Sequence, residues 1–253
     1  MQPIPSPLAL REVAPAQLSR LLRDSRPMLE VNPLPARLPD LKDGEQVNAR
    51  VVDSLSGNRF LVLPPWLADS NEFPGRDKIV IEPKSAFGTG HHATTALCLT
   101  VLSELVESGR VKAGQHFLDL GTGSGVLGIG CCKSGLTGEG YDIDMLAVEN
   151  AIENRGINGI EGFEVGLGSI DALEGRTYDL VLANILARPL IELSQRIVWA
   201  CKPGACLVLS GLLEIQADSV EEAYMAQCLP KPRRVIDGEI GRASCRERVS
   251  SPV

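Results

Sequence analysis

The chain has 253 residues, which suits one catalytic domain of ordinary size with a smaller N-terminal piece. Its formal net charge of −7 makes nucleic acid a poor expected partner and favours a basic protein, because an acidic surface repels phosphate backbones. No apolar run approaches the roughly 20 residues that span a bilayer, and the N-terminus lacks the basic start and apolar stretch of a signal peptide. We therefore expect a cytoplasmic monomer with no direct contact to nucleic acid or membrane.

The first part of the chain reads as a proline-rich segment, 1–45, followed by a small β-rich linker region, 46–85. A short helix is predicted at Pro15–Arg23, where three leucines share one face. The linker region is predicted to hold three short strands, the first two paired as a hairpin: Val47–Val52, Arg59–Leu63 and Lys78–Ile81.

From Gly114 onward, apolar strand-like runs alternate with helical stretches. The predicted strands are His116–Leu120, Gly138–Ile143, Gly162–Leu167, Tyr178–Asn184 and Ala205–Ser210. The predicted helices are Gly125–Ser134, Met145–Asn154, Pro189–Cys201 and Ile215–Ala226. Buried strands that alternate with helices predict an α/β fold, a doubly wound and mostly parallel sheet with helices on both faces. Ligands of such sheets bind at the carboxyl ends of the strands.

The clearest signal for a ligand is the glycine turn Asp119-Leu-Gly121-Thr-Gly123-Ser-Gly125, which joins an apolar strand to a helix. Glycine permits a tight turn and a close approach of a ligand to the backbone. The start of the following helix offers free N–H groups to an anionic ligand group. The overlapping run Gly123-Ser-Gly125-Val-Leu-Gly128 also fits the dinucleotide pattern G-x-G-x-x-G, so a nicotinamide cofactor stays open.

An acidic residue follows at the end of the next strand. Asp142 lies 21 residues after Gly121 (142 − 121), the spacing expected of an acid that binds ribose hydroxyls. This argument fits both an adenosyl methyl donor and a dinucleotide. Asp142 could instead cap the helix that starts at Met145, but Asp144 is better placed for that role.

Two further segments carry polar residues toward the same edge. The loop Glu82–Thr95 precedes an apolar helical stretch, Ala96–Leu105, which Thr94 or Thr95 could cap. Adjacent histidines cannot easily converge on one ion, so His91 and His92 do not indicate a metal, and we predict none. Asn184 ends an otherwise apolar strand. The chain lacks an Asn-Pro-Pro-aromatic run after it, which disfavours DNA or glutamine methylation.

Over about Phe60–Val235 the chain resembles the PrmA family, the lysine methyltransferases that act on ribosomal protein eleven of the large subunit. The resemblance rests on three motifs in the right order: Ala86-Phe-Gly-Thr-Gly-His-His-Ala-Thr-Thr95, the glycine turn, and Asn184-Ile-Leu-Ala187. It implies S-adenosylmethionine as cofactor and a class I, Rossmann-like methyltransferase domain at 86–239. It also implies that Thr95, Gly121, Asp142 and Asn184 contact the cofactor, with Asn184 as the catalytic residue beside the transferred methyl group.

The resemblance implies a protein-lysine N-methyltransferase whose partner is ribosomal protein eleven. Another protein lysine as substrate, a nicotinamide-dependent oxidoreductase, and a binding module that has lost catalysis remain as alternatives. One departure concerns the substrate, since residues 1–45 do not read as the compact α/β recognition domain that the family usually carries.

The second departure is the C-terminus. Arg233–Glu239 reads as the start of the first of two closing strands, and the resemblance stops there. Ile240–Val249 shows no hydrophobic alternation, and codons that encode it resemble a sequencing-library adapter. We therefore expect 240–253 to be a non-native tail, irregular and exposed, and the sheet to lack its last strand.

Overall fold

The computed structural model describes residues 50–52, 59–69, 75–82, 93–236 and 242–247. Contacts along the chain separate Met1–Gln46 from Val47–Val253, and every described residue lies in the second unit. The predicted helix Pro15–Arg23 and the proline-rich segment fall outside the described residues.

The centre of the fold is a seven-stranded sheet with the order β6-β5-β4-β7-β8-β10-β9. Its strands are β4 (His116–Leu120), β5 (Thr137–Asp142), β6 (Phe163–Leu167), β7 (Tyr178–Asn184), β8 (Cys201–Ser210), β9 (Arg233–Ile236) and β10 (Arg242–Glu247). The first five strands in this order, β6 to β8, are parallel to one another, as predicted. From β4 the chain steps outward to β5 and β6, then returns to the other side of β4 for β7 and β8. In such sheets the expected place for a ligand is where the strand order reverses, at the carboxyl ends of β4 and β7.

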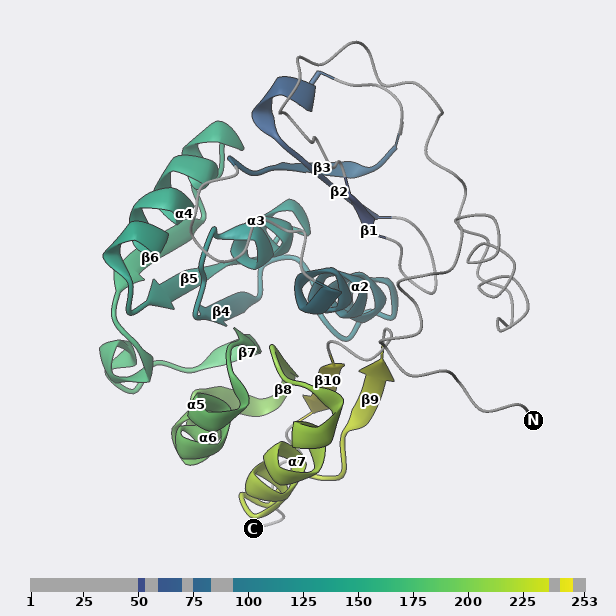
Figure 1. The fold of residues 1–253 in the computed structure, drawn as a ribbon, viewed down its shortest axis with the longest axis vertical. Coiled ribbons are helices and arrows are strands. Elements are labelled where there is room, and N and C mark those ends of the chain that lie inside the picture. The colour runs from purple at the N-terminus through teal and green to yellow at the C-terminus, as the bar shows by residue number, and fades with distance from the viewer. Residues whose placement is uncertain (1–49, 53–58, 70–74, 83–92, 237–241, 248–253) are drawn as a thin grey trace, which may run out of the picture. The chain divides into compact units, whose positions relative to one another are not determined.

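Helices cover both faces of this sheet (Figure 1). One face carries α2 (Ala93–Glu107), α3 (Val126–Lys133) and α4 (Met145–Ile157), and the other carries α5 (Ala187–Glu192), α6 (Ser194–Trp199) and α7 (Ala217–Met225). Strand β7 serves both cores, because Leu180 and Leu182 face the first layer while Val181 and Ala183 face the second. The doubly wound architecture is therefore confirmed.

The segment Pro189–Cys201 is not the single helix that its pattern predicts. It lies across α5 and α6, which meet at Leu193, and its last residue already belongs to β8. The reason is tertiary pairing: Tyr178 at the start of β7 donates its N–H to the Ala200 carbonyl at 2.8 Å and pairs with Cys201. Sheet formation therefore overrides the helical periodicity of the last residues.

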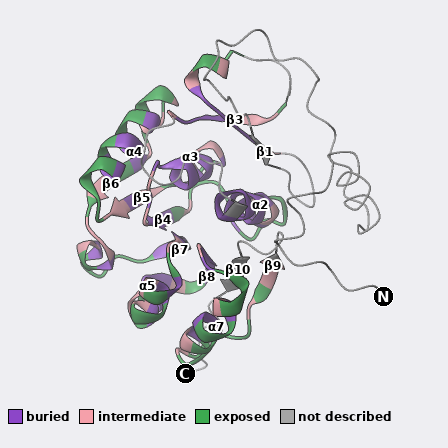
Figure 2. Cartoon of the chain, in the orientation of Figure 1, coloured by how far each residue is buried: buried purple, intermediate pink, exposed green. Residues whose placement is uncertain are grey.

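A second, three-stranded sheet covers the outer side of α2 and α3. It consists of β1 (Arg50–Val52), β2 (Phe60–Leu63) and β3 (Asp77–Val80). The short 3-10 helix η2 (Pro65–Leu67) follows β2 in the chain. Strands β1 and β2 are antiparallel, which confirms the predicted pairing. Phe60 and Ile79 share one buried cluster with Leu99 of α2 and Ile129 of α3. Helices α2 and α3 are therefore covered on two sides, and Figure 2 shows most of each helix as buried.

The expectation of an irregular tail and an incomplete sheet is wrong for Arg242–Glu247. These residues form β10, which lies between β8 and β9 and pairs antiparallel with both. Strands pair through backbone N–H and C=O groups, so a segment without hydrophobic alternation can still satisfy the edge of β8. Beyond β8 the sheet therefore ends in two antiparallel strands, β10 and β9. Residues 240–241 and 248–253 lie outside the described residues.

Candidate functional site

The glycine turn after β4 is held from within by Asp119. This side chain is 1% exposed, and its carboxylate accepts hydrogen bonds from Thr122 Oγ1 at 2.8 Å and Gly128 N at 3.1 Å. Burial raises the pKa of Asp119 to about 6, while these two hydrogen bonds act in the opposite direction. Asp119 therefore fixes both ends of the turn and is itself shielded from ligand.

The first glycine of the turn is packed closely against the segment that follows β7. Gly121 has φ +73°, and a Cβ atom there would lie 2.2 Å from Ile185 Cγ2, so no other residue fits without a shift. The N–H groups of Gly121 and Thr122 both donate to the Tyr141 carbonyl, at 2.8 and 3.1 Å. This ties the turn to the end of β5.

Asp142 follows Tyr141 and completes that connection. Its Oδ2 accepts from Gly123 N at 2.9 Å, and its Oδ1 accepts from Asp144 N at 3.0 Å. A carboxylate offers about four lone-pair sites, so each oxygen can accept one more hydrogen bond. The N-cap of α4 is Asp144, whose side chain accepts from Leu146 N at 3.0 Å, as the sequence indicated. Asp142 is therefore available to a ligand.

Asn184 is the last residue of β7, and only one of the two polar groups of its side-chain amide has a hydrogen-bond partner. Its Nδ2 donates to Thr95 Oγ1 at 3.3 Å, whereas its Oδ1 is buried and has no hydrogen-bond partner. Helix α2 begins at Ala93, so Thr94 and Thr95 lie in its first turn, and the prediction that one of them caps the helix is wrong. A buried acceptor without a partner costs free energy and is expected where a ligand supplies the missing donor.

Three of the four predicted site residues lie side by side, and the fourth joins them through a hydrogen bond. Leu120 pairs with Tyr141 on one side and with Ala183 on the other, which places Gly121 between Asp142 and Asn184. Thr95 reaches the same place from α2. His91, His92 and the rest of the loop 83–92 lie outside the described residues. Among the residues that are described, no three His, Cys, Asp or Glu side chains gather as a metal site requires.

A row of asparagines on α4 and at its C-cap, which the sequence reasoning missed, connects the end of the small sheet with the glycine turn. Asn154 is fully buried; it accepts from Glu82 N at 2.9 Å and donates to the Ser124 carbonyl at 2.9 Å and to Asn150 Oδ1 at 3.3 Å. One turn further, Asn158 exchanges two hydrogen bonds with the backbone of Val80. The spacing of four residues was visible in the sequence and places these amides on one helix face.

Exposed apolar side chains flank the site on both sides. Ile143 is 81% and Leu167 52% exposed, at the ends of β5 and β6 near Asp142. Leu186 is 71% and Ile215 86% exposed, after β7 and β8 on the side of Asn184. The carboxyl edge of the sheet therefore offers apolar surface to both sides of a polar centre.

The comparisons with a family model and with curated proteins indicate the same family. The family model described as ribosomal protein L11 methyltransferase (PrmA) matches residues 55–239. The ribosomal protein L11 methyltransferase of Myxococcus xanthus is 43% identical over 175 residues, 69% of this chain and 58% of the relative. That of Syntrophotalea carbinolica is 40% identical over 179 residues, 70% of this chain and 57% of the relative. The chain thus spans less than three fifths of the length of these curated relatives.

Solved structures extend the comparison to the fold. A ribosomal protein L11 methylase from Lactobacillus delbrueckii subsp. bulgaricus superposes with a TM-score of 0.68 at 26% identity, over 77% of this chain and 97% of that one. A methyltransferase from Pyrococcus furiosus, 14% identical over 59% of this chain and 83% of that one, has a TM-score of 0.51, a likeness of fold alone.

In the part of the chain that the structure describes, no helix is both long and apolar enough to cross a membrane.

Proposed function

Because the chain belongs to the PrmA family of ribosomal protein L11 methyltransferases, we propose that it transfers a methyl group from S-adenosylmethionine to a lysine amine of ribosomal protein L11. The observation that carries this proposal is the unpartnered Asn184 Oδ1 beside the glycine turn. An amine N–H is the donor that this oxygen lacks. A ribosomal substrate is consistent with the expected cytoplasmic location and with the acidic net charge of −7.

The residues present fit S-adenosylmethionine group by group. The bare backbone at Gly121 and the start of α3 suit the amino acid part of the cofactor, and Asp142 suits the ribose hydroxyls. The exposed Ile143 and Leu167 beside Asp142 suit the apolar faces of an adenine ring. Thr95 borders the same space through its contact with Asn184. The family match gives no support to the nicotinamide alternative.

In this mechanism the protein mainly orients the amine. The bound cofactor would supply a methyl group on a sulfonium, from which a neutral thioether is a good leaving group. A lysine amine has an unperturbed pKa of about 10.4 and must lose a proton before it can attack. Asn184 Oδ1 accepts a hydrogen bond from the neutral amine and so directs its lone pair, while Thr95 holds the amide in place.

The test is methylation of purified ribosomal protein L11 with S-adenosylmethionine, followed by mass spectrometry of its lysines. We expect methylated lysine, and Asn184→Ala should lower the rate at saturating cofactor by about tenfold or more, since 1.4 kcal/mol of a lost hydrogen bond is tenfold. Methylation only of other proteins would move the substrate to another protein lysine. Turnover of a nicotinamide cofactor without methyl transfer would overturn the proposal.

A further inference from the structure

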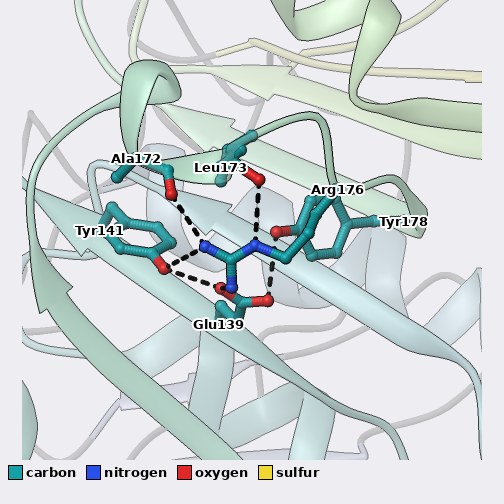
Figure 3. Close-up of polar contacts among 6 residues, drawn as sticks. All are labelled: Glu139, Tyr141, Ala172, Leu173, Arg176 and Tyr178. Atoms are coloured by element: carbon teal, nitrogen blue, oxygen red, sulfur yellow. Dashed lines mark hydrogen bonds and ion pairs between the residues drawn. The ribbon is translucent and has the colours of Figure 1, made fainter.

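A cluster of polar side chains joins β5 to the segment that connects β6 with β7 (Figure 3). Arg176 lies between η3 (Ile170–Leu173) and β7. Its guanidinium donates from Nε to the Leu173 carbonyl at 3.0 Å and from Nη2 to the Ala172 carbonyl at 2.8 Å. Nη2 also donates to the Tyr141 hydroxyl at 3.0 Å, and Nη1 forms an ion pair with Glu139. One side chain thus holds the end of η3 against two residues of β5.

Glu139 holds the other side of this cluster. Its carboxylate accepts from the Tyr141 hydroxyl at 2.7 Å and from the Tyr178 hydroxyl at 3.2 Å, besides pairing with Arg176. The side chain of Glu139 is 15% exposed, against 43% for Arg176. A partly buried carboxylate with three donors fixes the directions of all of them. The cluster therefore restrains the side chains of these residues, and none of the printed side-chain contacts within it involves Gly121, Asp142 or Asn184.

Both segments that the cluster joins are connected to Asp142. Tyr141 precedes Asp142 directly, and its carbonyl holds Gly121 N. On the other side, the segment before η3 is attached by Gly168 N, which donates to the Asp142 carbonyl at 2.8 Å. A rotation of Tyr141 or a shift of η3 would therefore move Asp142 and Leu167 relative to the glycine turn.

We propose that the Arg176–Glu139–Tyr141 cluster positions the adenosine half of the cofactor site, by fixing the end of β5 and the loop after β6 as one unit. This inference rests on the proposed function, because it takes Asp142 as the ribose acid. Arg176 is then a positioning residue, which touches neither the cofactor nor the reacting atoms.

The test compares Arg176→Ala and Tyr141→Phe with a matched control, Lys202→Ala. Lys202 forms a partly exposed ion pair with Asp179 at 2.8 Å, at the starts of β8 and β7, the opposite edge of the sheet. Calorimetry measures the affinity for S-adenosylhomocysteine and for 5′-methylthioadenosine, which lacks the amino acid part. We expect Arg176→Ala to weaken both ligands by about tenfold and to raise the cofactor KM with kcat little changed, because only the binding surface is displaced. Arg176→Lys should recover part of the loss, since it keeps the charge opposite Glu139.

The outcomes separate this inference from the proposed function. Unchanged affinities in folded Arg176→Ala, or an equal loss in Lys202→Ala, would overturn the inference. A loss for S-adenosylhomocysteine without a loss for 5′-methylthioadenosine would overturn it too, because the effect would then not belong to the adenosine half. If Arg176→Ala does not fold, Tyr141→Phe decides the matter, since it removes a single hydroxyl. A wild-type chain that binds neither ligand would instead refute the proposed function.

Discussion

Asp142 uses one lone pair of each carboxylate oxygen on the backbone, toward Gly123 and Asp144, which leaves the others for the ribose of the proposed cofactor. Asp142→Ala should weaken S-adenosylhomocysteine binding about ten- to hundredfold, because a hydrogen bond to a charged group contributes roughly 1.5–3 kcal/mol. Asp144→Ala is the control: it removes the N-cap of α4 and should cost about 1 kcal/mol of stability without this loss of affinity. Equal binding by wild type and Asp142→Ala in calorimetry would make Asp142 structural only.

Asp119 gives the chain a specific pH dependence. Burial raises its pKa from 3.8 to about 6, so between these values the folded state binds more protons than the unfolded state. The contribution of this group to stability therefore falls as pH rises through the window from about 4 to 6 and is constant above it. Asp119→Asn removes this titration while keeping an acceptor for Thr122 and Gly128. Urea unfolding from pH 3.5 to 7 should show the wild type losing about 3 kcal/mol relative to the variant. Parallel curves for the two proteins would contradict this.

The asparagine row of α4 connects the small sheet with the glycine turn, and Asn154 is its only member with contacts to both sides among the described residues. Asn154→Ala removes the hydrogen bonds to Glu82 N and to the Ser124 carbonyl, and the loss of a buried hydrogen bond costs roughly 1–3 kcal/mol. We expect a loss of about 2–4 kcal/mol in unfolding free energy. Cofactor affinity should fall as well, because the glycine turn loses a hydrogen bond that holds Ser124 in place.

Asn158→Ala is the matched control for this prediction. It removes the two hydrogen bonds to Val80 but touches no part of the glycine turn. Chemical denaturation should therefore show destabilisation, while calorimetry shows an unchanged affinity for S-adenosylhomocysteine. Equal effects of the two variants on affinity would mean that the row supports the fold without reaching the site.

How far the sequence predicts each element depends on whether the signal is local. The strands His116–Leu120 and Tyr178–Asn184 were predicted with the bounds that the structure shows, because each is a continuous apolar run between clear breaks. Helix α2 begins three residues before the predicted start. An alanine followed by two threonines carries no clear signal for the first residue of the helix. The Arg176 cluster could not be predicted, since its contacts depend on which strands become neighbours.

For the whole molecule, topology explains why the convergence of the candidate residues was easier to predict than the order of the strands. Gly121 follows β4, Asp142 ends β5 and Asn184 ends β7, and any parallel sheet brings such ends to one edge. The order of the outer strands carries no comparable rule. A strand between β8 and β9 requires only backbone partners, and the composition of 242–247 does not reveal it.

The last strand gives a prediction for the molecule as a whole. Deletion of 240–253 removes β10, whose residues pair with four positions of β8 and four of β9. Each backbone hydrogen bond contributes roughly 0.5–1.5 kcal/mol, so we expect a loss of several kcal/mol, and the freed edge of β8 should promote aggregation. Thermal unfolding and light scattering measure both effects.

Ser244→Pro, which keeps the length but removes a donor in mid-strand, should act in the same direction. The soluble fraction of either variant should still bind S-adenosylhomocysteine, because the proposed cofactor residues lie at β4, β5, β7 and α2. An undiminished melting temperature in both would show that β10 adds nothing to the sheet, and a loss of binding in folded protein would extend the site to this edge.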